Sequence, residues 1–251
     1  MAHTIIGTKL GMTQRFGPDD ESIPVTVIKC GPCTVIRTKT TDGKDGYNAV
    51  QVAFDAVPER KVTKPRLGEY QRRKIAPHRI LREFRVTADE VKQYETGKVM
   101  TVDGLRQGYF IDIIGTTKGR GFQGVVKRHG FHGHDAAHGA HEVYRHPGTG
   151  GMGSIFPGRV PLGRGRPGQM GNARQTTQSL QIVDVDETRG LVYLKGAVPG
   201  PTGGLVMIVE ARKMADVKVD KRIAAAQAEA TKQGGKMLNP LKAAKRAAKS
   251  G

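Results

Sequence analysis

The sequence predicts a mainly β protein: a β-barrel with one long inserted loop and a basic C-terminal extension. Three observations support this fold class. Short β-branched runs recur between turn residues, which is typical of barrels built from short strands. The 63 residues of 115–177 include sixteen glycines and show no sustained hydrophobic period. The last residues, 213–251, are rich in alanine and lysine.

The N-terminal part is predicted to form strands over 23–30, 34–39 and 47–54. In these runs β-branched or aromatic residues alternate with polar ones, as expected where one face of a strand is buried. Glycine-bearing turn signals stand at 17–20 and 41–46, and they separate the first strands as hairpin connections would.

The segment 60–85 is basic, with ten Lys or Arg against only Glu69 and Glu83. Pro65 suits the first turn of a helix, so we expect a short helix from Pro65 to Arg73, ended by Pro77. A strand over 80–86 follows. Because the whole chain carries a net charge of +18, we expect these cations to contact phosphates as well as solvent.

Five further strands are predicted over 99–102, 109–114, 180–185, 191–194 and 205–209. Strands on both sides of the long glycine-rich stretch can complete one sheet. We therefore predict a discontinuous barrel domain (1–114 and 178–212), an extended loop (115–177) and a C-terminal extension (213–251). Within the extension, 219–233 is a good helix by propensity, and 241–250 is a basic tail expected to be disordered or helical only on a partner.

The inserted loop has the composition of a segment that folds on a polyanion. It holds nine Lys or Arg and six His against Asp135 and Glu142, and the chain has a pI near 10.1. Self-repulsion and chain entropy oppose its collapse, whereas a folded RNA would neutralise the cations and hydrogen-bond the glycine-exposed backbone. The predicted RNA-binding residues are Lys118, Arg120, Lys127, Arg128, His129, His132, His134, Arg145, His146, Arg159, Arg164, Arg166 and Arg174.

Three motifs that could indicate an enzyme or a cofactor site lack the neighbouring sequence that such a site requires. The run Gly119-Arg-Gly121-Phe-Gln-Gly124 matches a dinucleotide or kinase glycine loop, but no long helix or kinase motif follows it. The pair Cys30-Gly-Pro-Cys33 precedes a predicted strand, so we interpret it as a structural pair at a turn rather than a redox pair. The histidines lie among glycines that give no rigid frame for zinc. We therefore expect no catalytic residue, no metal and no cofactor.

Membrane and export signals are also missing from the sequence. No run approaches the ~18 apolar residues of a spanning helix. The N-terminus lacks the charged start and apolar core of a signal peptide. We expect a protein that is not exported and has no membrane partner.

Several motifs, in order along the chain, resemble the bacterial form of the universal third protein of the large ribosomal subunit. The longest run begins at Leu105, includes Asp112-Ile-Ile-Gly115-Thr-Thr and ends with Lys127-Arg-His-Gly-Phe-His-Gly133. Others are Gly7-Thr-Lys-Leu-Gly-Met-Thr13, Gly46-Tyr-Asn-Ala-Val50, Leu81-Arg-Glu-Phe-Arg85, Gly168-Gln-Met-Gly-Asn172 and Lys195-Gly-Ala-Val-Pro-Gly200. The resemblance covers roughly residues 3–210 and does not extend to the tail after about residue 213.

The resemblance implies a barrel of the translation-protein type and a structural role in the large ribosomal subunit. It implies direct binding to 23S ribosomal RNA near its 3′ end early in assembly, a loop directed toward the peptidyl-transferase centre, and other large-subunit proteins as neighbours in the cytoplasmic ribosome. In some bacterial members the glutamine of the Gly-Gln-Met run carries an N5-methyl group. Here that residue is Gln169, and its modification would make a glutamine methyltransferase a partner.

Two other classes of function compete with this interpretation. A nucleic-acid-modifying barrel enzyme would need convergent acids or thiols, and the loop has only two acids. Another basic nucleic-acid-binding protein, such as one that compacts DNA, would suit the alanine–lysine tail but has no evident use for the glycine–histidine insertion.

Overall fold

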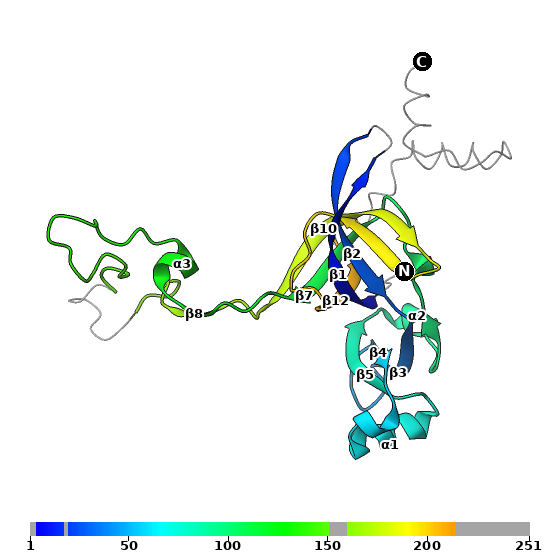
Figure 1. Ribbon diagram of the computed structural model, residues 1–251. Coiled ribbons are helices and arrows are strands. Elements are labelled where there is room, and N and C mark those ends of the chain that lie inside the picture. The colour runs from blue at the N-terminus through cyan, green and yellow to red at the C-terminus, as the bar shows by residue number, and fades with distance from the viewer. Residues whose placement is uncertain (1–3, 18–19, 151–159, 214–251) are drawn as a thin grey trace. The chain divides into compact units, whose positions relative to one another are not determined.

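The computed structural model describes residues 4–17, 20–150 and 160–213 (Figure 1). The described residues divide into two compact units. Those within Met1–Thr116 and Gln175–Gly251 form unit 1, and those within Thr117–Arg174 form unit 2. The helix predicted over 219–233 and the basic tail over 241–250 lie outside the described residues.

A closed six-stranded barrel forms the larger part of unit 1, with the strand order β1-β12-β7-β10-β11-β2 (Figure 1). The strands that flank the inserted segment, β7 and β10, are neighbours in this barrel, so the prediction that they complete one sheet is confirmed. The strands are β1 Ile5–Phe16, β2 Ser22–Cys30, β7 Phe110–Thr116, β10 Arg174–Asp186, β11 Leu191–Lys195 and β12 Leu205–Glu210.

The barrel interior is filled by aliphatic side chains that alternate along the strands. Ile28, Ile113 and Ile208 are fully buried, and Ile5 and Ile182 are nearly so. Burial of such a side chain stabilises the fold by about 1.5–3 kcal/mol relative to exposure. The interior therefore supplies a rigid frame that holds the ends of β7 and β10 together.

A four-stranded sheet with the order β5-β4-β3-β6 forms the rest of unit 1. One hydrophobic cluster contains Val35, Val52 and Phe84 of this sheet together with Ile6 and Ile111 of the barrel, so the two sheets share a core. The remaining elements are β3 Cys33–Lys39, β4 Ala49–Ala56, β5 His78–Arg85, β6 Val99–Met100, α1 Lys64–Arg73, α2 Ala88–Val91, and the 3-10 helices η1 Glu59–Lys61 and η2 Val102–Gly104.

Helix α1 packs on the four-stranded sheet through a single large side chain. Tyr70 is 2% exposed, contacts the buried Ile36 and Ala53, and donates a hydrogen bond to the carbonyl oxygen of His78 at 3.0 Å. Pro65 stands in the first turn and Lys74 caps the C-terminus in the left-handed conformation. The helix predicted from Pro65 to Arg73 is confirmed, and its orientation is fixed by Tyr70.

The cysteine pair is structural, as interpreted from the sequence. Cys30 and Cys33 are free and buried at the junction of β2 and β3. The Cys33 sulfur accepts a hydrogen bond from the backbone N–H of Ile6 at 3.4 Å. Burial raises the pKa of the Cys33 thiol to about 11 and raises that of Cys30 further above its ordinary value. Both thiols therefore stay protonated and unreactive at neutral pH.

The mainly β fold class is confirmed, and three local predictions need correction. Strand β1, the longest of the N-terminal strands, was not predicted from its sequence. The strand predicted over 99–102 ends at Met100, because Val102 opens η2. The inserted segment is predicted to contain neither strand nor helix, but its described residues include two short strands and one short helix between β7 and β10. No helix among the described residues is long and apolar enough to span a membrane.

Candidate RNA interface

Unit 2 begins with two chain segments that run antiparallel to each other. Strand β8 (Gly121–Gln123) pairs with β9 (Gly168–Met170), and Phe122 lies opposite Gln169. The pairing continues beyond these strands, because the N–H of Thr117 donates to the carbonyl oxygen of Ala173 at 2.9 Å. Backbone hydrogen bonds hold this ribbon, so it needs no alternation of apolar residues.

Helix α3 (Val125–His129) follows β8 directly and places basic residues at its last turn. Val125 is 2% exposed and fixes the helix, whereas Lys127, Arg128 and His129 are exposed. Cations are favoured at this end because the helix dipole is negative there. A single side chain therefore anchors the helix, and its cationic end faces solvent.

Two of these cationic residues also connect the outgoing and returning parts of unit 2. The Arg128 guanidinium donates to the carbonyl oxygen of Arg166 at 2.8 Å, and the His129 imidazole Nε2 lies 3.1 Å from the same oxygen. These bonds bring Arg128 and His129 to Arg166, which lies 38 and 37 positions further along the chain. The remaining guanidinium nitrogens of Arg128 are available to a phosphate.

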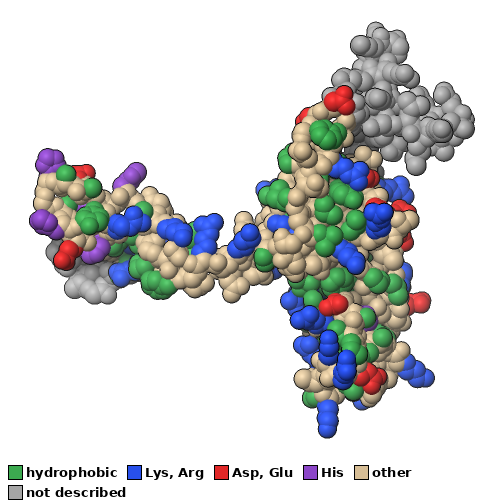
Figure 2. Space-filling model, in the orientation of Figure 1, with side chains coloured by type: hydrophobic (Ala, Val, Ile, Leu, Met, Phe, Trp, Pro, Cys, Tyr) green, Lys and Arg blue, Asp and Glu red, His purple; other side chains and the backbone are tan. Residues whose placement is uncertain are grey.

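The segment after α3 is held by few contacts. The N–H of His134 donates to the carbonyl oxygen of Tyr144 at 3.1 Å, and every residue from 141 to 150 is exposed. Among the described residues, no three His, Cys, Asp or Glu side chains come together as metal ligands do. Figure 2 shows His side chains gathered in this part of unit 2, with Lys and Arg nearby.

All but one of the predicted RNA-binding residues lie in the described chain, and all of these are exposed. None of them forms an ion pair with a described carboxylate. Arg159 lies outside the described residues. Arg174 is both the first residue of β10 and the last residue of unit 2, and the others lie earlier in unit 2. The exposed set is Lys118, Arg120, Lys127, Arg128, His129, His132, His134, Arg145, His146, Arg164, Arg166 and Arg174.

The structure adds exposed apolar residues that the sequence reasoning did not assign to the interface. Phe122 is 74% exposed on the ribbon beside Gln169, Tyr144 is 47% exposed, and Leu162 is fully exposed. Large exposed apolar side chains on a cationic segment suit contact with unstacked bases or sugar faces. In the sequence, the one feature that could have indicated their exposure is that each stands alone among glycine and basic residues.

Comparisons with known proteins agree with the motifs in this segment. The family model described as ribosomal protein L3 matches residues 56–207. A large ribosomal subunit protein uL3 from Pelotomaculum thermopropionicum is 46% identical over 213 residues, covering 85% of this chain and 99% of the relative. The protein of the same name from Petrotoga mobilis is 47% identical and covers 83% and 95%, and that from Streptomyces coelicolor is 46% identical and covers 83% and 96%.

Proposed function

The chain belongs to the ribosomal protein L3 family, and on that premise we propose that it binds 23S ribosomal RNA directly through the exposed cations of unit 2. As a member of this family it is a structural constituent of the large ribosomal subunit and not an enzyme. Its partners are ribosomal RNA and other ribosomal proteins. The observation that carries the proposal is that every predicted contact residue in the described chain is exposed and without a carboxylate partner.

The chemistry of unit 2 supports a folded RNA as the ligand. Uncompensated Lys and Arg gain most from phosphates, because binding releases the counterions of the nucleic acid. Exposed glycine backbone gives phosphate oxygens and 2′-hydroxyls close access to N–H groups, and exposed His can donate to the same acceptors. We propose that residues 115–177 extend into the RNA toward the peptidyl-transferase centre and that 1–114 and 178–212 form the supporting barrel domain.

We also propose that the chain binds early in assembly, near the 3′ end of 23S ribosomal RNA. A segment with many exposed cations and few internal contacts is best placed while the RNA is still open. Neighbouring ribosomal proteins would then bind beside the barrel. Among the described residues of unit 2 no acid–base or nucleophile arrangement comes together, because Asp135 and Glu142 are exposed and form no ion pair there.

Binding to full-length 23S ribosomal RNA is expected to depend steeply on salt. If about six phosphates are neutralised, the logarithm of the association constant should fall by roughly 4–5 per decade of salt concentration. Filter binding of the full chain between 0.1 and 1 M salt would measure this slope. An affinity that does not change with salt would contradict the proposal.

Gln169 is expected to carry one methyl group on its side-chain amide in at least part of the native population. Its side chain is exposed on β9, and its amide nitrogen lies 3.4 Å from the carbonyl oxygen of Met170, so no strong hydrogen bond shields it from a methyltransferase. Methylation removes one of two N–H donors, which suits an RNA crevice with a single acceptor because an unsatisfied donor costs about 1–3 kcal/mol. Mass spectrometry of peptides from native subunits decides the matter, and a Gln169 peptide without the ~14 Da increment of one methyl group rejects it.

A further inference from the structure

Helix α1 of unit 1 presents a basic face opposite its buried side. At 3.6 residues per turn, Lys64, Gly68 and Arg72 follow one another at intervals of four on one face, and Tyr70 points the other way. All three are exposed, whereas Tyr70 is 2% exposed against the sheet. Gln71, also exposed, borders the same face. This face carries no large apolar side chain, so it lacks the anchors of a typical protein–protein contact.

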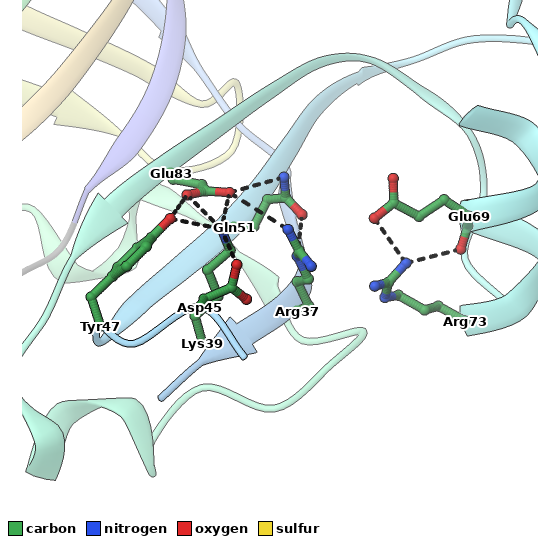
Figure 3. Close-up of polar contacts among 8 residues, drawn as sticks. All are labelled: Arg37, Lys39, Asp45, Tyr47, Gln51, Glu69, Arg73 and Glu83. Atoms are coloured by element: carbon green, nitrogen blue, oxygen red, sulfur yellow. Dashed lines mark hydrogen bonds and ion pairs between the residues drawn. The ribbon is translucent and has the colours of Figure 1, made fainter. Parts of the chain in front are cut away.

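The two acidic residues of the segment 60–85 already form ion pairs with other side chains. The Glu69 carboxylate pairs with Arg73 at 3.0 Å, and that of Glu83 pairs with Lys39 at 3.0 Å and with Arg37 at 3.9 Å (Figure 3). The exposed cations around α1 are therefore left without a described carboxylate partner. These are Arg60, Lys61, Lys64, Arg66, Arg72 and Lys74. Figure 2 shows Lys and Arg side chains gathered over the end of unit 1 where Figure 1 places α1.

Lys39, also in unit 1, is a cation whose charge is balanced by a neighbouring carboxylate. Its side chain is 7% exposed, and its ammonium donates to the Tyr47 hydroxyl at 2.7 Å as well as to Glu83 (Figure 3). The Tyr47 hydroxyl and the Glu83 carboxylate raise the pKa of this ammonium above its ordinary value. Lys39 therefore helps to hold the sheet together, whereas Lys64, Arg66 and Arg72 of α1 have no described carboxylate partner.

Gly68 is a second, independent sign that something approaches this face. It is the only glycine inside a described α-helix, and glycine disfavours a helix relative to alanine. A Cβ at this position would meet no atom within 4 Å, and the backbone is helical, so alanine would fit. The fold itself therefore gives no reason for glycine between Lys64 and Arg72.

We propose that this face of α1 is a second RNA-docking surface, separate from unit 2. Lys64 and Arg72 bind phosphates of folded ribosomal RNA, and Gly68 lets the sugar–phosphate backbone approach the helix more closely than any side chain would allow. The inference rests on the proposed function only in taking ribosomal RNA as the ligand. An acidic protein segment is the competing occupant, and the absence of apolar anchors on the face disfavours it.

The charge test compares the double variant K64Q/R72Q with the matched variant K44Q/R106Q, which removes two exposed cations of unit 1 that are not part of α1 or of the basic segment 60–85. For full-length 23S ribosomal RNA at 0.1 M salt, we expect K64Q/R72Q to bind about ten- to thirtyfold more weakly and its salt slope to be shallower by about 1.5. K44Q/R106Q should differ from the wild type by less than about threefold. Equal effects of the two double variants would overturn the inference.

The steric test uses Gly68→Ala and predicts effects of opposite sign. The melting temperature should rise by about 3 °C, because alanine stabilises the helix in a chain of this size. RNA affinity should nevertheless fall about fivefold, because the added methyl group overpacks a close contact. Gly68→Gln, with a larger neutral side chain, should lower affinity further. A more stable protein with unchanged RNA affinity in both variants would overturn the inference.

The two proposals fail in different ways. If the wild-type chain does not bind ribosomal RNA, the proposed function fails. If unit 2 variants lose affinity while the α1 variants bind like the wild type, the proposed function stands and the second surface does not exist. If K64Q/R72Q keeps its RNA affinity but loses a ribosomal protein from reconstituted subunits, the face binds protein and the inference is wrong.

Discussion

Replacing Arg120, Lys127 and Arg128 together with glutamine is expected to weaken binding to 23S ribosomal RNA by about a hundredfold at 0.1 M salt. All three side chains are exposed in unit 2, and none has a described carboxylate partner. Each lost phosphate contact removes about 0.7–0.9 from the salt slope, so the slope should become shallower by about 2–3. Filter binding over a range of salt concentrations measures both changes.

The barrel should melt at the wild-type temperature in this triple variant, because the three residues belong to unit 2 and none is part of the hydrophobic core of unit 1. The variant K44Q/K92Q/R106Q, which removes three exposed cations from unit 1, is the matched control for net charge. Subunit reconstitution should fail with the unit 2 variant and proceed with the control. Loss of barrel stability before loss of RNA affinity would show that these residues are structural.

The strands that the sequence predicts well are those with β-branched or aromatic residues at every second position. In β4, Val50 and Val52 are fully buried and pair across the sheet with β3 and β5. Strand β1 escaped prediction because Gly7 and Gly11 interrupt its hydrophobic pattern. A Cβ on Gly7 would lie 2.8 Å from the Ile28 side chain, so this glycine is required by close packing of two strands. No local pattern reveals such a requirement.

The short elements of unit 2 could not be predicted for a different reason. Their partners are distant in sequence: Gly121 pairs with Met170, and Arg128 bonds the carbonyl oxygen of Arg166. Backbone hydrogen bonds between segments so far apart leave no periodicity in either one. The exposure of the basic side chains, by contrast, follows from their chemistry, because an unpaired cation is almost never buried.

The residues of the basic α1 face can be identified only when residue type and structure are used together. Composition alone marks 60–85 as basic, but it cannot separate Arg73, which pairs with Glu69, from Arg72, which points to solvent. Nor does it show that Gly68 is unnecessary for packing, since that depends on what a Cβ would meet. The sequence therefore predicts the charge of this surface, and only the structure identifies its residues.

Replacing Gly171 with alanine is expected to open the antiparallel ribbon at the start of unit 2. Gly171 has a φ of +71°, and a methyl group there would overlap the carbonyl oxygen of Lys118 on the opposite segment. The left-handed backbone costs a non-glycine residue about 1–2 kcal/mol, and relieving the overlap costs about 1–3 kcal/mol more. The hydrogen bonds next to the overlap, including that from Arg120 N–H to Met170 oxygen at 2.9 Å, should break.

Gly121 provides a matched control on the facing strand. Its φ is +69°, nearly the same as that of Gly171, but a Cβ there would meet nothing within 4 Å. Gly121→Ala therefore pays only the backbone cost, and its ribbon amides should exchange about tenfold faster than in the wild type. In Gly171→Ala the amides of Thr117 and Arg120 should exchange at least about a hundredfold faster, and RNA affinity should fall by about tenfold because the ribbon is no longer preorganised. Hydrogen exchange of the two variants side by side measures the difference, and equal exchange rates would mean that a small shift of Lys118 accommodates the methyl group.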